Sequence, residues 1–226
     1  MKIGILETGR PPEELAGAYP DYPAMFADLL AAPDLTFRPY AVLDGELPAS
    51  VTEADGWLIT GSRHGVYEDH DWIAPLKAFI REIDAAGQPL VGICFGHQIM
   101  AEALGGRAEK YDGGWALGAH EYRGSDGQVH RLNAFHQDQV TEVPPGAEVI
   151  ASSPFCQYAA LRYRGNMVSL QPHPEFAADY LAALLDLRRG IFPPGMADNS
   201  PPVPDQSAAT AWATALIHGA LRAKSS

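Results

Sequence analysis

Short apolar runs alternate with helically spaced apolar residues through the first half of the chain. The apolar runs predict buried strands at 2–6, 36–42, 56–60 and 89–93. Apolar residues at helical spacing predict helices at 25–30 and 72–86, and Gly87 then supplies a stop signal. Because Pro39 cannot donate to a strand ladder, 36–42 is expected at an edge of the sheet. Strands that alternate with helices across short links predict a parallel sheet covered on both faces.

The pattern changes after Gly114, where short apolar runs follow one another without a helical segment between them. They predict strands that form an antiparallel extension of the main sheet, at 116–122, 132–136, 149–152, 158–163 and 167–171. The end of the chain is expected to hold a helix at 177–189, a proline-rich connection at 192–205 and a last helix at 208–223. The sequence therefore predicts a single α/β domain over residues 1–226, built on a doubly wound, mostly parallel sheet.

Composition narrows the class of protein further. Of the 226 residues, 46% are apolar and 19% charged, which is typical of a folded globular protein and excludes a coiled coil or a disordered chain. The net charge is −12 and Lys and Arg form no cluster, so nucleic-acid binding is not expected. No apolar run approaches the roughly 20 residues of a membrane span, and the N-terminus resembles no secretory signal. We therefore expect a cytoplasmic protein that binds neither nucleic acid nor membrane.

Cys94 lies where a predicted buried strand meets a predicted helix. Gly92 and Gly96 flank it, and such small residues let the backbone bend sharply and let a substrate come close. The N–H groups and the dipole of the helix N-terminus favour the thiolate over the thiol and can hold an oxyanion. A cysteine that only packs in the core is the alternative interpretation. We adopt that alternative for Cys156, which lacks this context.

A second candidate element follows the apolar strand at 167–171 and reads Gln171-Pro172-His173-Pro174-Glu175. A thiolate nucleophile needs a base and a group that orients the base. Glu175 can bind one ring nitrogen of His173 and leave the other nitrogen for a nucleophile. Alone, a His-x-Glu segment is usually a surface pair. Combined with Cys94 at the sharp turn between a strand and a helix, it predicts a catalytic triad of Cys94, His173 and Glu175.

These residues resemble the class I glutamine amidotransferase family. The resemblance rests on the segments 92–98 and 171–175 and covers most of the chain. It implies a flavodoxin-like fold, a cysteine enzyme with the triad just described, and no cofactor. The implied reaction is attack of Cys94 on a glutamine side-chain amide, release of ammonia, and hydrolysis of a γ-glutamyl thioester. His173 would protonate the departing nitrogen and later activate water.

The resemblance also implies roles for residues around the triad. Gln98 would help to bind the substrate glutamine, and the backbone N–H of Phe95 would bind the oxyanion. The second oxyanion donor stays open between Gly61 and Ser62, because this chain has Thr-Gly-Ser-Arg where many members have Gly-Gly-Pro.

A further departure lies at His136-Gln137-Asp138, where synthetase-linked members such as GMP synthase glutaminase domains commonly have Ser-His-Gly-Asp. This segment resembles the free-standing branch of the family, which includes plant γ-glutamyl peptidases that act on glutathione conjugates. We therefore expect His136 and Gln137 to contact the substrate. A polar loop residue with no substrate role is the alternative for His136.

Three functions stay open at this point. The first is a glutaminase that supplies ammonia to a synthetase on another chain, the second is a free-standing γ-glutamyl peptidase, and the third is a sensing module without catalysis. The intact triad disfavours the last, and the Pro-His-Pro-Glu element disfavours other families with a cysteine elbow. We expect no metal site, because neither cysteine belongs to a Cys-x-x-Cys pair and helical i, i+4 ligand spacing is missing from His64, His70, His120 and His130.

Overall fold

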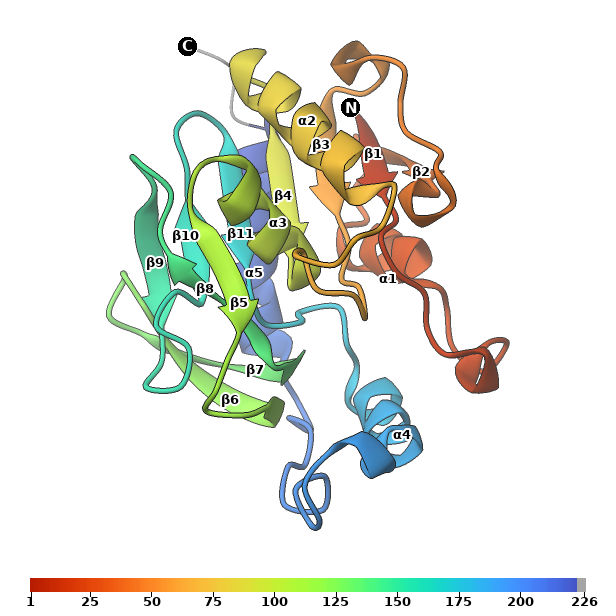
Figure 1. Ribbon diagram of the computed structural model, residues 1–226, viewed down its shortest axis with the longest axis vertical. Coiled ribbons are helices and arrows are strands. Elements are labelled where there is room, and N and C mark those ends of the chain that lie inside the picture. The colour runs from red at the N-terminus through yellow and green to blue at the C-terminus, as the bar shows by residue number, and fades with distance from the viewer. Residues whose placement is uncertain (223–226) are drawn as a thin grey trace.

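In the computed structural model, which describes residues 1–222, helices pack against both faces of a large twisted sheet (Figure 1). Five parallel strands form its first half: β1 (Lys2–Leu6), β2 (Thr36–Tyr40), β3 (Gly56–Ile59), β4 (Leu90–Ile93) and β11 (Met167–Leu170). Their order is β2-β1-β3-β4-β11, and every neighbouring pair is parallel. The strand that contains Pro39 lies at the edge, as its sequence predicts.

Antiparallel strands continue the sheet beyond β11. They are β10 (Ala160–Arg162), β9 (Glu148–Ser152), β6 (Ala116–Gly124) and β7 (Val129–His136). The pairs β11/β10, β10/β9, β9/β6 and β6/β7 are all antiparallel. The predicted α/β class, with a mostly parallel sheet and an antiparallel extension, is confirmed.

The sequence patterns missed a separate two-stranded sheet, in which β5 (Arg107–Lys110) pairs with β8 (Asp138–Glu142). In β5 only Ala108 is buried, and three of its four residues are charged. So short a strand, with a single buried position, carries no readable alternation of apolar and polar residues.

The described helices are α1 (Tyr22–Leu29), α2 (Ile73–Ala85), α3 (Phe95–Ala103), α4 (Ala178–Leu187) and α5 (Ser207–Arg222). All except α4 pack on one of the two faces of the sheet, and α4 packs in a separate apolar cluster with Met25 of α1 and Leu117 of β6. In Figure 1, α2 and α3 lie in front of the sheet and α5 lies behind it. In β3, Trp57 and Ile59 pack with α2 and α3, whereas Leu58 packs with α1 and α5. This alternation explains why the central strands are apolar at every position. The predicted last helix extends to Ala223, which lies outside the described residues.

The proline-rich connection at 192–205 runs back over the antiparallel strands before α5 begins. The N–H of Ala119 donates to the carbonyl of Pro201 (3.0 Å), and a Cβ at Gly118 would lie 2.2 Å from the carbonyl oxygen of Ser200. Because Gly118 has no side chain and has a φ of +70°, the connection 192–205 can pack directly against the backbone of β6. Short 3₁₀ turns complete the described elements, at Glu13–Leu15, Val42–Asp44, Val51–Glu53 and Arg189–Ile191.

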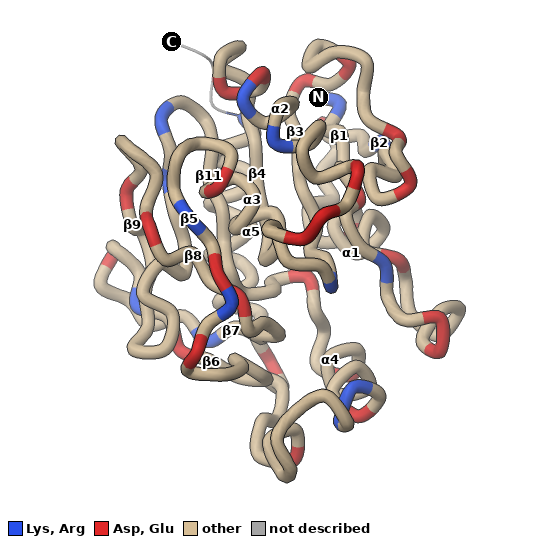
Figure 2. The backbone as a smooth tube through the Cα atoms, in the orientation of Figure 1, with Lys and Arg blue, Asp and Glu red and all other residues tan. Residues whose placement is uncertain are grey.

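Charged residues are spread along the chain, and Figure 2 shows Lys and Arg at scattered positions with no large cluster. Acidic residues gather on the loop 60–72 between β3 and α2, which contains Glu68, Asp69 and Asp71. Among residues 1–222, none of the helices is both long and apolar enough to cross a bilayer.

Candidate active site

Cys94 occupies a strained turn between β4 and α3. Its φ of 53° and ψ of −103° make it the single non-glycine residue with positive φ among residues 1–222. The N–H of Cys94 donates to the carbonyl of Leu170 in β11 (2.8 Å), which ties the turn to the neighbouring strand. A Cβ at Gly92 would lie 2.4 Å from the carbonyl oxygen of Gly96, so the turn needs glycine there. Such strain costs about 1–3 kcal/mol and is concentrated at functional sites.

His173 lies just beyond the end of β11 and is held from two sides. Its Nδ1 contacts Oε1 of Glu175 at 2.7 Å, and both side chains are almost fully buried. Its ring stacks on Phe176 with centroids 3.9 Å apart and an interplanar angle of 4°. The imidazole therefore has one orientation, with Nδ1 directed to the carboxylate and Nε2 left for another partner.

Cys94, the third predicted member of the triad, faces the ring of His173, and the two residues line the same cavity. Burial by itself lowers the pKa of His173, but the charges of Glu175 and Cys94 and hydrogen bonds with both outweigh it and raise this pKa to about 10. His173 is therefore charged at neutral pH. The structure brings the three residues together, as their sequence motifs predict.

The sequence patterns gave no indication of a hydrogen-bond network around the loop that carries His173. The side chain of Gln206, at the start of α5, donates to the carbonyls of Pro174 (3.2 Å) and Phe176 (2.9 Å). Asn133 of β7 donates to the same Phe176 carbonyl (2.9 Å), and its own carbonyl accepts the N–H of His173 (2.9 Å). Asn133 is fully buried. These amides hold the His173 loop against β7.

The segment with the predicted oxyanion donors lies close to Cys94. A Cβ at Gly61 would lie 3.2 Å from Cε1 of His173 and 3.8 Å from Cβ of Cys94, and Ser62 lines both cavities beside Cys94. Phe95 is the first residue of α3, where the helix offers no acceptor for its N–H. All three candidate donors therefore adjoin Cys94.

Residues after β1 hold this segment, and no sequence motif indicated them. The hydroxyl of Thr8 donates to the carbonyl of Thr60 (2.9 Å), and the N–H of Thr8 donates to the Thr60 hydroxyl (3.0 Å). A Cβ at Gly9 would lie 2.7 Å from the carbonyl oxygen of Gly61 and 2.8 Å from Cα of Ser62. The close approach of these two loops therefore depends on glycine at position 9.

The predicted substrate-binding residues Gln98, His136 and Gln137 line a cavity together with Cys94. The amide of Gln98 donates to the carbonyl of Asp138 (2.8 Å) and to Oε1 of Gln171 (3.1 Å), and Gln137 donates to the carbonyl of Tyr111 (3.3 Å). His136 is buried, and its Nδ1–H donates to the carbonyl of Asp138 (3.1 Å).

The protonation state of His136 follows from its surroundings. Burial, together with the charge of His173, lowers the pKa of His136 to about 3. Since Nδ1 carries the proton, Nε2 is an acceptor, and it has no partner among the described residues. His136 thus adds a neutral hydrogen-bond acceptor to the wall of the cavity.

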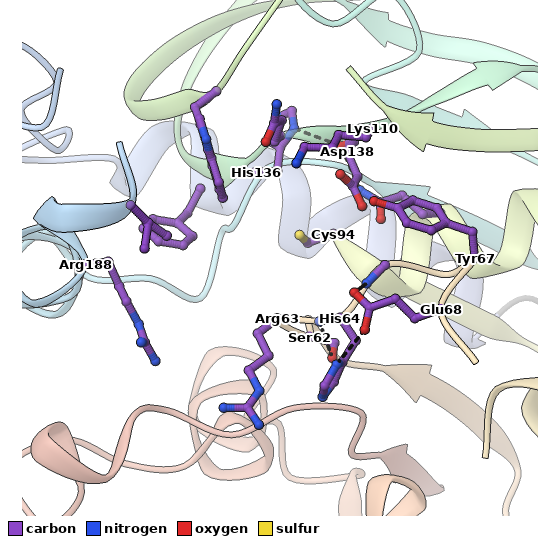
Figure 3. Close-up of a pocket in the computed structure, with 16 residues that line it drawn as sticks. Ser62, Arg63, His64, Tyr67, Glu68, Cys94, Lys110, His136, Asp138 and Arg188 are labelled. Atoms are coloured by element: carbon purple, nitrogen blue, oxygen red, sulfur yellow. Dashed lines mark hydrogen bonds and ion pairs between the residues drawn. The ribbon is translucent and has the colours of Figure 1, made fainter. Parts of the chain in front are cut away.

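Two adjoining cavities of about 340 Å³ and 540 Å³ open at Cys94. In Figure 3 its sulfur lies between the loop that carries Ser62 and His64 and the segment that carries His136 and Asp138. Besides Cys94, the two cavities share Ser62, Arg63, His64, Phe135 and Arg188.

The cations of these cavities differ in their ion pairs. Arg10 is paired with Glu7 and Asp44. Arg63 and Arg188 make no ion pair with any residue in 1–222. Lys110, which lines the smaller cavity, also makes no ion pair with a residue in 1–222. The two cavities at Cys94 are therefore lined by three cations without an ion pair, Arg63, Lys110 and Arg188.

The histidines expected to be non-ligands lie in different surroundings. His120 packs near Phe155, and His130 stacks on Trp212 beside Asp126. His64 and His70, in contrast, converge on Glu68 in the loop 60–72. Helical spacing, which was the basis of the expectation, gives no information about ligands that a loop brings together.

Three comparisons relate the chain to known proteins. The family model described as "Glutamine amidotransferase class-I" matches residues 38–181. Gamma-glutamyl peptidase 4 of Arabidopsis thaliana is 30% identical over 202 residues, which cover 82% of this chain and 80% of that protein. A GMP synthase [glutamine-hydrolyzing] of Azoarcus sp. (strain BH72) is 37% identical over 152 residues, but these cover 57% of this chain and only 28% of the synthase.

Solved structures of glutamine amidotransferases have the same fold as this chain. A glutamine amidotransferase from Thermotoga maritima superposes with a TM-score of 0.77 at 20% identity and covers 98% of this chain and 99% of its own. A glutamine amido transferase from Methylobacillus flagellatus superposes with a TM-score of 0.74, also at 20% identity, and covers 97% and 92%. The mostly parallel sheet with its antiparallel extension is thus a recurrent arrangement.

Proposed function

Because the chain belongs to the class I glutamine amidotransferase family, we propose that it hydrolyses γ-glutamyl amide bonds with Cys94 as nucleophile. The observation that carries this proposal is the strained turn at Cys94, which faces the imidazole of His173 with Glu175 behind it. A sensing module has no need of a cysteine in a strained backbone conformation beside a buried, charged histidine. The same pair is typical of a thiolate nucleophile and its general acid.

The first half of the reaction forms a thioester. The sulfur of Cys94 attacks the γ-carbonyl carbon, and the carbonyl oxygen takes up negative charge. N–H groups of Phe95 and of the segment 61–62 stabilise that charge. The C–N bond then breaks, and the nitrogen leaves as ammonia or an amine with the proton of His173 Nε2.

The second half releases glutamate. His173, now neutral, takes a proton from a water molecule as that water attacks the thioester carbonyl. The C–S bond breaks, Cys94 returns to the thiolate, and His173 is charged again. Glu175 stabilises the charged imidazole in both halves and keeps Nδ1 protonated.

We further propose that γ-glutamyl peptides are the substrates, and that no partner synthetase is required. The match to the plant γ-glutamyl peptidase covers 82% of this chain and 80% of the peptidase. The match to the GMP synthase covers 57% of this chain and only 28% of the synthase. The unpaired charges of Arg63 and Arg188 beside Cys94 suit a leaving amine that carries a carboxylate.

Steady-state assays of the purified chain test this proposal. Glutamate release is measured from glutamine, from γ-glutamyl dipeptides and from glutathione conjugates. We expect turnover of at least one peptide by the chain alone, none in Cys94→Ala, and unchanged turnover in Cys156→Ala. A trapped γ-glutamyl adduct on Cys94, detected by intact-protein and peptide mass, is the matching covalent evidence.

Other outcomes contradict distinct parts of the proposal. Turnover of glutamine only after a synthetase is added, with no peptide cleaved, would support an ammonia-supplying subunit instead. Undiminished hydrolysis by Cys94→Ala would exclude cysteine chemistry. Binding of γ-glutamyl compounds without any turnover would support a sensing module.

A further inference from the structure

The loop 60–72 holds a cluster of side chains that the proposed reaction does not use. His64 Nδ1 lies 3.0 Å from Oε2 of Glu68, and His70 Nε2 lies 2.8 Å from the same oxygen. The two imidazole rings contact each other edge to face, with centroids 4.1 Å apart. Two histidines therefore converge on one carboxylate oxygen rather than sharing its two oxygens.

The rest of the loop holds these three groups in place. The N–H of Gly65 donates to Oε1 of Glu68 (2.7 Å), which fixes the carboxylate and directs Oε2 toward the imidazoles. His70 stacks on Trp72 at an interplanar angle of 12°, and Trp72 is buried. The N–H of His64 donates to Oγ of Ser62 (3.2 Å). The side chains of Glu68 and His70 thus each have a partner that orients them, and the backbone of His64 is fixed by Ser62.

The distances between the three ligand atoms suit a bound ion. All three atoms lie within 4.8 Å of one another. Zinc binds imidazole nitrogen and carboxylate oxygen at about 2.0–2.2 Å, so neighbouring ligand atoms in its tetrahedral shell are about 3.3–3.6 Å apart. The two contacts to Glu68, at 3.0 and 2.8 Å, are a few tenths of an ångström shorter, so a bound ion requires only a small outward shift of the ligand atoms.

We propose that His64, Glu68 and His70 form a binding site for Zn²⁺ or a similar divalent transition metal. Imidazole nitrogens favour such ions over Mg²⁺ and Ca²⁺, which prefer oxygen ligands. Three protein ligands leave at least one coordination position for water or a ligand group. Since His64 and Glu68 also line the cavity that contains Cys94, the ion would border the substrate site (Figure 3).

The loop around these three side chains also carries further acidic residues. Asp69 and Asp71 in the same loop add negative charge nearby.

Zinc titration of the purified chain against a chelating dye tests the site. The titration is run in the Cys94→Ala background, because a thiolate beside His173 is itself a plausible zinc ligand. We expect one Zn²⁺ per chain, an affinity lowered roughly 100-fold or more by His70→Phe or Glu68→Gln, and no competition from excess Mg²⁺. His70→Phe keeps a ring against Trp72 and removes the nitrogen.

His130→Phe is the matched control, because His130 also stacks on a tryptophan and also lies beside a carboxylate (3.3 Å from Asp126). It should bind zinc as the parent does. Absence of stoichiometric binding, or equal loss of binding in His130→Phe and His70→Phe, would overturn the proposal and leave a hydrogen-bonded cluster only.

The visible spectrum of Co²⁺ bound to the unsubstituted chain provides a test that needs no variant. Nitrogen and oxygen ligands are expected to produce ligand-field bands without a sulfur-to-metal charge-transfer band. A strong charge-transfer band would assign the ion to Cys94 and refute the loop site. Because neither measurement depends on turnover, failure of the metal site is distinguishable from failure of the proposed hydrolase activity.

Discussion

At the scale of single residues, the proposed chemistry depends on the difference between two buried cysteines. Cys94 is in a strained turn and lines both cavities, whereas Cys156 is 2% exposed in the core behind the sheet. Burial raises the pKa of Cys156 to about 12. A thiol that is both inaccessible and protonated reacts slowly with electrophiles.

Limited alkylation with iodoacetamide at neutral pH should therefore modify Cys94 and spare Cys156. Peptide mapping by mass spectrometry measures the ratio of the two products. Predominant modification of Cys156 would contradict the assignment of Cys94 as nucleophile.

The His173–Glu175 pair makes both activity and stability depend on pH. The pKa of His173 rises from an ordinary 6.5 to about 10. Its stabilising contribution is therefore complete below pH 6.5 and is lost as pH rises toward 10. Glu175→Gln removes the charge that raises this pKa, so the difference in thermal stability between parent and variant should shrink between pH 6.5 and 10.

The same variant should shift the alkaline limb of kcat/KM to lower pH, because the imidazole then loses its proton earlier. We expect His173→Ala to lower kcat roughly 10³-fold or more and Glu175→Gln to lower it less. An alkaline limb that Glu175→Gln leaves in place would remove Glu175 from the proposed role.

Gly9→Ala tests the contact between the loop after β1 and the oxyanion segment. Its new methyl group would lie 2.7 Å from the carbonyl oxygen of Gly61 and push the segment 61–62 away. We expect kcat to fall roughly 10- to 100-fold, since small displacements of catalytic groups have effects of that size. Gly190→Ala is the control, because a Cβ there meets no atom within 4 Å. Equal kcat in both variants would contradict a role for this contact.

At the scale of elements, the loop that carries His173 and Glu175 depends on segments far away in the chain. His173 and Glu175 follow β11, but their backbone is held by Asn133 of β7 and by Gln206 at the start of α5. Asn133 also accepts the N–H of Val203 (2.8 Å), which ties the connection 192–205 to β7. The connection 192–205 and Gln206 therefore support the loop that carries His173 and Glu175.

Gln206→Ala should lower kcat roughly 10-fold or more, because the carbonyls of Pro174 and Phe176 lose a donor and the His173 loop gains freedom. KM should change little, since Gln206 lines neither cavity at Cys94. Gln128→Ala, at an exposed turn, is the control. A variant that loses thermal stability but keeps kcat would indicate a structural role only.

At the scale of the whole molecule, the proposed substrate preference depends on residues that three separate segments bring to one cavity. Arg63 comes from the loop after β3, Arg188 follows α4, and Cys94 lies at the start of α3. Neither arginine has an acidic partner within residues 1–222. Two such cations next to the nucleophile favour a leaving group with a carboxylate.

Arg188→Gln and Arg63→Gln should each raise KM for γ-glutamyl-alanine roughly 5-fold, the size expected of a partly exposed ion pair. KM for γ-glutamyl-alaninamide, which lacks the carboxylate, should stay the same. Arg189→Gln is the matched control, because Arg189 lines neither cavity at Cys94 and pairs with Asp186 and Asp198. Equal effects on both substrates would contradict recognition of the carboxylate.

The sequence by itself determined the parts of this protein that depend on local pattern. Continuous apolar runs predicted the buried parallel strands, Pro39 predicted the edge strand, and the motifs around Cys94 and His173 predicted the family. These signals are readable because burial, turn geometry and catalytic chemistry each restrict residues that are neighbours in the chain. The assignment of the triad itself stays a prediction that the assays above test.

Only the tertiary structure decided which distant residues meet. Nothing near Gln206 in the chain indicates that its amide supports the loop of His173, and nothing near Thr8 indicates its contact with Thr60. The strand β5 pairs with β8 although its own pattern is too short to read. His64 and His70 converge on Glu68 because of the path of a loop. Such contacts depend on how packed elements are positioned, which is a property of the whole fold and not of any local sequence window.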